Sequence, residues 1–477
     1  MALRQYRIPV FYGIQQGVTE NRMNDGESPD ACNMDTTGGR LSVAKGYVRE
    51  HSTPFPSPQD VKRLYIWKHA GGRQLIVATG DKLYVLDETT GQWRVFYTFE
   101  ASAAATQYDF QTVKIASTEY LLISNGNARM AKWDGVSESA IPFGSAEGLS
   151  DMAVNFTELY YARLFAAGDH NFPSRLYYSQ APGDTRSIEN WTSAEESENV
   201  GGGHVEIGTD SDPITGLVAL SNQLLIFKRD SLYRLLGDRP SNYRIQPVNG
   251  TMQQPSHTAC VRIGDVLFFL TSGGLYYFDG QSVQKKPDAE KVRELLSGAN
   301  LSACTAAVCR DKLYFALREG AGEGVNDGIL IYDLARATYM IRRGFCAYGL
   351  FASGGTLYIV DANGYVCRFE EGESYDGARI DAYWKTPMTD LDSKAIGKRL
   401  EELYLRGSGG ILSVEAVMES GTVYNERLMP GESERILELG LTGDGRAFQL
   451  IFRNVNGSHF TIDGGVELIL DTQRRVL

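Results

Sequence analysis

The stretch GGLYYFDG, residues 273–280, is one of five variants of a single strand-and-turn phrase in this chain. The others are DKLYVLD at 81, DSLYRLLGD at 230, DKLYFAL at 311 and GTLYIVDANG at 355. Neighbouring side chains of a strand point to opposite faces, so each Leu-Tyr pair can serve two packing interfaces. The Asp and Gly that often follow suit the positive-φ positions of tight hairpin turns. The repetition therefore favours an all-β fold built from copies of one small sheet.

The phrase returns at intervals of about forty residues. Leu232 to Leu275 is 43 residues (275 − 232), Leu275 to Leu313 is 38 (313 − 275), and Leu313 to Leu357 is 44 (357 − 313). The runs RLYIWK, QLIVATG, KLYVLD and WRVFYTF, between 63 and 99, supply four short strands, the content of one propeller blade. The sequence thus predicts a β-propeller of about seven blades over residues 59–375.

The two regions that flank the repeats have a different pattern of residues. Residues 1–58 end in STPFPSP, whose prolines oppose regular strand pairing, and we expect an extended N-terminal arm. Residues 376–477 carry longer alternating runs and predict a C-terminal antiparallel β-sandwich. Within the array, DAEKVRELLSG at 288–298 is typical of a helix, with Val292, Leu295 and Leu296 on one face and Gly298 as its stop.

The charge balance is acidic. The chain has 477 residues, with 47 Lys and Arg against 59 Asp and Glu, a net charge of −12. Sequence-specific DNA binding normally needs a basic face, so that class is disfavoured, whereas loose passage of DNA through an acidic channel remains open. No run approaches 18 apolar residues, and the opening MALRQYRIPVFYGIQQG lacks the apolar core of a secretion signal, so we expect no membrane insertion.

The sequence contains no recognisable metal or nucleophile motif. The six cysteines form no Cys-x-x-Cys pair and are expected to be reduced thiols of a protein folded in the cytoplasm. No histidine lies two to four residues from another, and no G-x-S-x-G, H-E-x-x-H or P-loop occurs. We therefore expect no catalytic, cofactor-binding or metal-ligating residues and no cofactor. The histidines are His51, His69, His170, His204, His257 and His459.

Two loops offer weak ligand signals. In NVGGGHVEIGTDSDPITGL, residues 199–217, Gly201–Gly203 could approach a ligand, and Asp210 with Asp212 could hold a cation. Without a P-loop lysine, a loop leading into a strand is the favoured interpretation. Asp361 and Asn363 have calcium-like spacing, but the position of the bidentate Glu is Gly372, which favours a hairpin turn.

A propeller glycosidase would need two carboxylates flanking the scissile bond. The candidates each lie in a turn signature, and no pair can be argued from spacing. Two basic clusters, KAIGKR at 394–399 and RATYMIRRG at 336–344, are interpreted as solvated surface. The candidate carboxylates are Asp87, Asp134, Asp279 and Asp361.

Several longer phrases resemble structural proteins of bacteriophage tails. The N-terminal run contains ACNMD at 31–35, followed by Gly38-Gly39-Arg40-Leu41 and Gly46-Tyr47, and it resembles the segment that leads into the propeller of those proteins. RLFAAGDHNFPSRLYYSQAPGD (163–184) and ITGLVALSNQLLIFKRDSLYRL (214–235) are similar to blade phrases of the same group. YWKTPMTDLDSKAIGKRLEELYL (383–405) resembles the entry to their C-terminal sandwich. The family is the tail hub or nozzle proteins of short-tailed phages, including the packaged-DNA-stabilisation type.

The resemblance implies a structural virion protein with no enzymatic role. Members of this family form a ring, usually a hexamer, below the portal and adaptor, and they retain or conduct the genome. The implied partners are copies of the chain, portal, adaptor and other tail proteins, and genomic DNA that passes without sequence-specific binding. The implied location is the virion tail, assembled in the bacterial cytoplasm. The chain lacks the long platform insertions of the larger nozzle proteins, so attachment of tail fibres is not implied.

Two other functions stay open from the sequence. One is a phage fibre or receptor-binding module that recognises host glycan, which exposed aromatic side chains on loops would favour. The five tryptophans lie mostly within or beside strands and turn signatures, which does not favour it. The other is the propeller glycosidase, for which no acid pair was found. The tryptophans are Trp67, Trp93, Trp133, Trp191 and Trp384.

Overall fold

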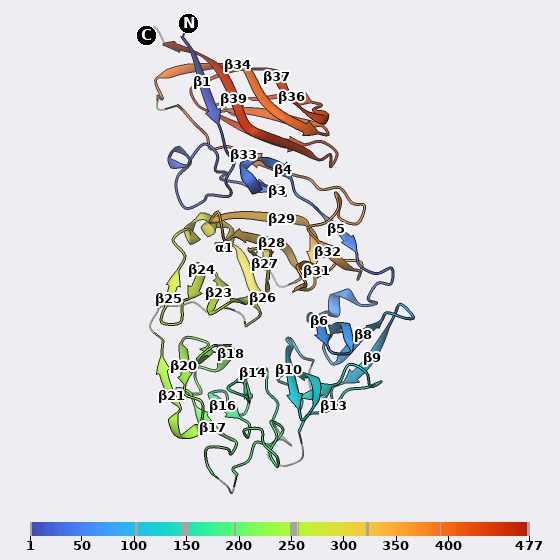
Figure 1. Ribbon diagram of the computed structural model, residues 1–477. Helices are drawn as coiled ribbons and strands as arrows, with labels where there is room; N and C mark the ends of the chain where they lie inside the picture. The colour runs from blue at the N-terminus through green and yellow to red at the C-terminus, as the bar shows by residue number, and fades with distance from the viewer. Residues whose placement is uncertain are drawn as a thin grey trace.

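The computed structural model describes residues 2–100, 104–144, 152–194, 197–248, 255, 257–320, 324–391 and 393–474. Over these residues the chain is mainly β-structure, with one short α-helix (Figure 1). Seven of its sheets have four strands each, in antiparallel order. Two larger sheets lie at the top of Figure 1, and one of them contains the first and the last strand of the described residues, β1 and β39.

The first four of the small sheets follow one another along the chain, each with its strands in sequence order. They comprise β6 (Arg63–His69), β7 (Gly72–Ala78), β8 (Lys82–Asp87) and β9 (Gln92–Thr98); β10 (Asp109–Ile115), β11 (Thr118–Ser124), β12 (Ala131–Trp133) and β13 (Ile141–Pro142); β14 (Phe156–Tyr160), β15 (Arg163–Ala167), β16 (Arg175–Tyr178) and β17 (Gly203–Glu206); and β18 (Ile214–Leu220), β19 (Gln223–Lys228), β20 (Leu232–Leu236) and β21 (Arg244–Pro247).

The remaining three small sheets continue this pattern, except that the last takes its fourth strand from the N-terminal region. They comprise β22 (Cys260–Ile263), β23 (Val266–Thr271), β24 (Gly274–Phe278) and β25 (Val283–Lys285); β26 (Ala299–Cys309), β27 (Lys312–Glu319), β28 (Asn326–Asp333) and β29 (Thr338–Ala347); and β30 (Leu350–Ser353), β31 (Thr356–Val360), β32 (Val366–Phe369) and β5 (Tyr47–Arg49).

The first strands of these sheets pack around a common centre. β10 lies against β14, β14 against β18, β22 against β26, β26 against β30, and β30 against β6. Tyr65 of β6 stacks on Phe110 of β10 with ring centroids 4.7 Å apart. Arg262 of β22 donates to the carbonyl of Ala219 in β18 at 2.7 Å. The seventh sheet therefore meets the first, and the arrangement is propeller-like.

Separate hydrophobic clusters fill the spaces between successive sheets, which explains the repeated Leu-Tyr phrase. Leu83 packs between the first and second sheets, whereas Tyr84 packs between the seventh and the first. Leu275 and Tyr276 likewise belong to different clusters. Adjacent residues thus contribute to opposite faces, as predicted, and each sheet must be apolar on both sides.

Two larger sheets lie outside the group of seven small sheets. The six-stranded sheet has the order β3 (Met34–Asp35), β4 (Leu41–Val43), β39 (Phe460–Arg474), β34 (Ile396–Gly409) and β37 (Gly431–Gly445), and β1 (Ala2–Ile8) also pairs with β39. The five-stranded sheet has the order β2 (Ala31–Cys32), β33 (Tyr383–Lys385), β38 (Phe448–Asn454), β35 (Leu412–Met418) and β36 (Val423–Leu428). One hydrophobic cluster joins these sheets to the sixth and seventh small sheets.

The prediction of an extended N-terminal arm over residues 1–58 is wrong, because its strands belong to three of the sheets. β1, β3 and β4 join the six-stranded sheet, β2 joins the five-stranded sheet, and β5 completes the seventh small sheet. The prolines oppose pairing only locally, because residues 52–58 contain no strand. Even there Phe55 is buried, with its ring edge-on to those of Tyr84 and Trp93. The segment therefore folds against its own chain.

The helical elements are short. The segment predicted as a helix, 288–298, forms the 3-10 turn Ala289–Val292 followed by α1 (Arg293–Ser297), with Gly298 at its C-terminal cap. Val292 and Leu296 are buried and Leu295 is partly buried, so the predicted apolar face is confirmed. The other 3-10 turns are Glu20–Arg22, Thr37–Gly39, Pro58–Asp60, Pro240–Asn242 and His257–Ala259.

Candidate functional site

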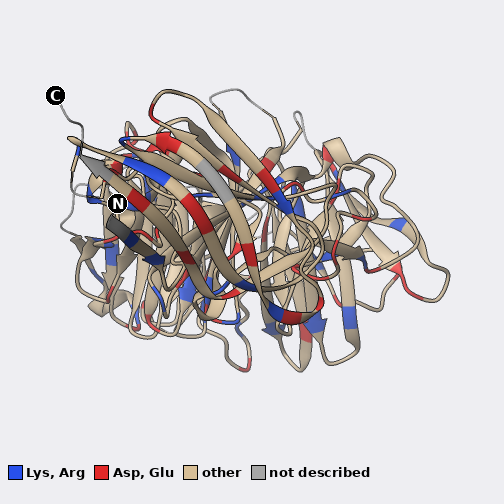
Figure 2. Ribbon diagram, turned by 90° about the horizontal axis from the view of Figure 1, so that it is seen from above, with Lys and Arg blue, Asp and Glu red and all other residues tan. Residues whose placement is uncertain are grey.

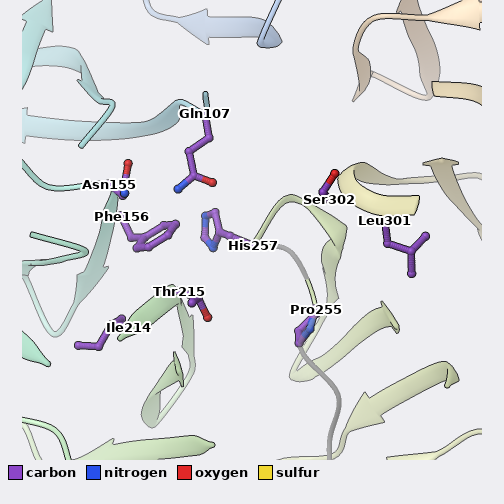
Figure 3. Close-up of a pocket in the computed structure, with 9 residues that line it drawn as sticks. All are labelled: Gln107, Asn155, Phe156, Ile214, Thr215, Pro255, His257, Leu301 and Ser302. Carbon is purple, nitrogen blue, oxygen red and sulfur yellow. The ribbon is translucent and has the colours of Figure 1, made fainter. Parts of the chain in front are cut away.

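A polar cavity lies where the first strands of several small sheets begin (Figure 3). Its volume is about 420 Å³. A second hollow of about 680 Å³ shares Gln107 and Ser302 with it, so the two are adjacent. Amide and hydroxyl side chains predominate among the polar groups of the first cavity. Its lining residues are Gln107, Asn155, Phe156, Ile214, Thr215, Pro255, His257, Leu301 and Ser302.

A histidine–carboxylate pair stands beside this cavity. His257, from the turn before β22, has its Nε2 3.6 Å from Oδ1 of Asp109, the first residue of β10. Asp109 Oδ2 accepts hydrogen bonds from the backbone N–H of Thr157, at 2.8 Å, and from its hydroxyl, at 3.2 Å. Burial raises the pKa of Asp109, but hydrogen bonding to His257 and Thr157 and the nearby positive charge hold it below its usual value.

Several polar atoms around the two hollows have no protein partner among the described residues. They include Nδ1 of His257, Oγ1 of Thr215 and Oγ1 of Thr305. Nε of Arg63, which lines the second hollow, is also without a partner. Buried polar groups normally find a hydrogen bond, often to water. The cavity is therefore suited to water or to a small polar molecule.

Glu158, a second carboxyl group near the centre, differs from Asp109 in the direction of its pKa shift. Burial, and then the charge of Asp109, raise the pKa of Glu158 in β14 to about 8. Glu158 is not among the residues lining either hollow. No hydroxyl or thiol donates to His257 in the described part of the chain, and no group of three or more His, Cys, Asp and Glu there could hold a metal. The geometry therefore offers no nucleophile–base pair.

Glu158 predicts a pH dependence of stability. The folded chain holds its proton up to about pH 8, whereas the unfolded chain releases it near 4.5. Its contribution to stability is complete below about 4.5 and is lost as the pH rises through about 8, with a slope of at most about 1.4 kcal/mol per pH unit. Glu158→Gln should flatten this decline in urea denaturation series. The exposed control Glu138→Gln should leave it unchanged; a decline that survives in Glu158→Gln would contradict the assignment.

The glycine-rich loop and its aspartates are occupied by structural contacts. Arg163 donates to the carbonyl of Gly201 at 2.7 Å, and Gly203 begins β17. Asp212 accepts from the backbone of Asp230 at 2.8 Å, and Asp210 accepts from the backbone of Ser174 at 3.3 Å. These contacts fit the interpretation of residues 199–217 as a loop that leads into a strand.

The four aspartates considered as glycosidase carboxylates all organise turns. In each case Oδ1 accepts the backbone N–H two residues further on, as in an Asx turn. Asp87, Asp134, Asp279 and Asp361 accept in this way from Thr89, Val136, Gln281 and Asn363 at 2.8–2.9 Å. The calcium-like Asp361 and Asn363 are therefore part of a hairpin turn.

The interpretation of the two basic clusters as solvated surface holds for Lys394 and Arg399, which are exposed, but is wrong for Lys398 and Arg342, which are buried. The segment 336–344 runs into β29, where Arg342 is fully buried, and Arg336 donates to the carbonyls of Thr36 and Phe11. Residues from 396 onward form β34, and Lys398 is buried with its ammonium donating to the carbonyl of Arg446 at 2.6 Å. These cations satisfy backbone carbonyls of distant segments, which local sequence does not display.

Sequence reasoning missed the His257–Asp109 pair. His257 is a single histidine without a motif, and Asp109 comes from a different sheet, so no spacing could connect them. The other histidines are elsewhere: the His69 ring stacks on Trp67 with centroids 4.2 Å apart, and His459 contacts the carbonyl of Glu373 at 2.7 Å. The six cysteines are free thiols, and no helix of the described residues is long and apolar enough to cross a membrane.

Comparison with known proteins leaves the function open. No family description and no curated protein matches the chain. Among solved structures, the extracellular domain of the hybrid two component system BT4673 from B. thetaiotaomicron is 11% identical, with a TM-score of 0.43 over 83% of this chain and 47% of that one. PorZ of the type-IX secretion system of Porphyromonas gingivalis is 12% identical, with a TM-score of 0.40 over 83% of this chain and 46% of that one. The chain spans about half the length of both.

A third similar structure is a domain rather than a longer protein. The AfRom2 CNH domain is 12% identical, with a TM-score of 0.43 over 68% of this chain and 99% of that domain. At these scores the likenesses carry no argument about substrate, partner or cellular role.

Proposed function

We propose that this chain is a structural, non-enzymatic virion protein, a tail nozzle or hub ring subunit of a short-tailed phage. In this role it would close or conduct the DNA exit channel below the portal and adaptor. The proposal includes a ring of identical copies, a hexamer by family resemblance, in the tail of a virion assembled in the bacterial cytoplasm. DNA would pass without sequence-specific binding, which agrees with a net charge of −12.

The proposed architecture is a seven-bladed propeller with a C-terminal β-sandwich. The seven four-stranded sheets would be the blades, with β5 from the N-terminal region closing the last one. The two larger sheets, whose facing side chains share one hydrophobic cluster, would be the sandwich. Closure by a strand from the other end of the array removes the weak seam that a purely sequential propeller would leave.

The observation that carries the proposal is the course of the N-terminal segment. Within its first 49 residues the chain supplies strands to the six-stranded sheet, the five-stranded sheet and the seventh small sheet. The carbonyls of this segment are further held by buried cations of β29, such as Arg342, which donates to Met34 at 2.8 Å. These contacts join the small sheets to the two larger sheets, which suits a structural subunit, and the described residues around the cavity offer no nucleophile–base pair.

Electron microscopy of the purified full chain tests the proposal. Annular particles with a central opening would support a ring subunit. Solitary particles or trimers would contradict it and favour the fibre or receptor-binding module. A polysaccharide hydrolysis screen on the same preparation separates the glycosidase, because turnover of any substrate would contradict a non-enzymatic role.

One observation favours the glycan-recognising alternative. Amides and hydroxyls such as those of Gln107, Asn155 and Ser302 in the central cavity suit sugar hydroxyls. The tryptophans do not add to it, because Trp67, Trp133, Trp191 and Trp384 are buried and Trp93 is partly buried. A glycan array with the full chain distinguishes the two, since binding at micromolar concentration would favour the receptor-binding module.

A further inference from the structure

The six-stranded sheet has two long open edges. β37 pairs only with β34, and β1 pairs only with β39, among the residues that the structure describes. Both strands lie at the top of the molecule, away from the small sheets (Figure 1). An open edge presents unpaired backbone N–H and C=O groups, so a long one is a template for another strand.

The β37 edge is long but not uniform. It spans 15 residues without a proline, and its pairing with β34 shifts register between Leu400 and Glu402 and between Gly407 and Gly409, so that 435–440 is its continuous stretch. Natural edge strands are usually short, bulged or protected by proline or inward-pointing charge. Ile436, near its middle, has 75% of its surface exposed, and Met429 in the turn before it has 69% exposed. Exposed apolar side chains beside a free edge would be covered if another strand paired there.

The two edges carry opposite charge. β1 reads ALRQYRI, with Arg4 and Arg7 and no acid, a charge of +2. β37 reads GESERILELGLTGDG, with four acids and one arginine, a charge of −3 (1 − 4). Blue on the strand that begins at the N-terminus, and red on the long strands beside it, are visible from above in Figure 2. The acids of β37 are Glu432, Glu434, Glu438 and Asp444.

Strand direction also fits one edge to the other. β1 is antiparallel to β39, β39 to β34, and β34 to β37, so β1 and β37 run in opposite directions. A second copy in the same orientation would place its β1 antiparallel to β37 of the first. The antiparallel order of the sheet would continue without interruption from one copy to the next.

We propose that β37 of one copy pairs with β1 of the next, so that the interface between copies is a continuous antiparallel sheet. This inference rests on the proposed ring function and names its contact surface. The interface is heterologous, and it closes into a ring only if the rotations of successive copies sum to a full turn without a rise along the axis. Two-fold pairing of β37 with β37, or of β1 with β1, would place like charges opposite each other, which is unfavourable.

The outward-facing side chains can form cross-strand pairs. Because Leu437 and Leu439 point inward, Glu434, Ile436 and Glu438 share the outer face of β37. Tyr6 and Ile8 point inward on β1, which leaves Arg7 on its outer face; Arg4 is on the same side as Tyr6 but is exposed. Arg7 now lies 3.7 Å from Glu467 while 66% exposed, and such exposed pairs rearrange at little cost.

Two charge-reversed variants test the pairing. Arg4→Glu with Arg7→Glu disables β1, and Glu434→Lys with Glu438→Lys disables β37. Each double variant alone should raise the concentration of half-assembly at least about tenfold in analytical ultracentrifugation of the full chain. Combining all four substitutions should restore assembly, because the charges are again complementary. The matched control, Lys45→Glu with Lys114→Glu, changes the same total charge at exposed sites away from both edges and should assemble normally.

Mixing the two defective variants identifies the type of interface. The first retains the original β37 and the second the original β1, and the reversed β1 of the first is complementary in charge to the reversed β37 of the second. The mixture should therefore assemble although neither variant does so alone. A two-fold interface would instead leave one of the two variants assembling fully by itself, which overturns the inference.

The outcomes separate the two proposals. Rings that assemble normally in both edge variants overturn the edge pairing and leave the ring function standing. Open filaments that dissolve in both edge variants support the edge pairing and contradict the ring. A chain that remains monomeric at every concentration, also in native mass spectrometry, overturns the edge pairing.

Discussion

Replacing Arg342 with methionine is expected to lower the free energy of unfolding by about 3–5 kcal/mol. Arg342 has no exposed side-chain surface, and its Nε donates to Glu370 at 2.9 Å. Its Nη2 lies 3.5 Å from Asp35, and its Nη1 donates to the carbonyl of Met34. Methionine keeps much of the volume but leaves Glu370 without its cation and Asp35 with Lys312 alone, 3.8 Å away, so the loss reports uncompensated charge rather than a cavity.

The matched control for Arg342→Met is Arg399→Met. Arg399 lies 3.3 Å from Glu401, but its side chain is 50% exposed, so its loss should cost less than about 1 kcal/mol. Urea denaturation of both variants at one pH gives the comparison. Equal losses of stability in the two variants would mean that the contacts of Arg342 do not join β29 to the N-terminal segment in an energetically important way.

Removing residues 2–50 is expected to abolish cooperative unfolding of the remaining chain. The truncation deletes β5, which pairs with β32, and β2, which pairs with β33, together with β1, β3 and β4 of the six-stranded sheet. It also exposes buried apolar surface that Phe11, Leu41 and Tyr47 cover. Calorimetry should show a broad or absent transition, together with strong binding of a dye that reports exposed apolar surface.

A shorter truncation serves as the control. Removing residues 2–8 deletes β1 alone and leaves β2 to β5 in place, so a single cooperative transition should persist at a lower midpoint. If the longer truncation unfolded with the midpoint of the full chain, residues 1–50 would be a detached arm after all.

The repeated strand could be predicted from sequence because every small sheet meets the same physical demand. GGLYYFDG contains the whole of β24, the third strand of its sheet, and Leu232 lies in β20, which is also a third strand. Leu313 and Leu357 lie in β27 and β31, which are second strands, so the spacing of 38 crosses from one strand position to another. The phrase therefore marks a strand buried on both faces rather than a fixed place in the sheet.

What the sequence could not reveal depends on partners far along the chain. Tyr47–Arg49 is too short to be recognised as a strand from the sequence, and it forms a strand by pairing with the edge of β32. Arg342 belongs to a run with three arginines that resembles solvated surface, and only folding brings Glu370 and Asp35 to it. His257 and Asp109 likewise come from different sheets, and neither carries a local motif. Local propensity fixes strands, whereas closure and buried charge depend on tertiary contacts.

Amide hydrogen exchange of the full chain tests most directly whether the N-terminal segment closes the ring of small sheets. Tyr47–Arg49 pairs with Cys367–Phe369, and Gly46 and Tyr47 donate to the carbonyls of Gly372 and Ser374. The amides of 47–49 that bond to β32 should therefore exchange only on global unfolding, as slowly as their partners in β32. Exchange at the rate of an unstructured peptide in residues 47–49, with β32 still protected, would contradict closure by this strand.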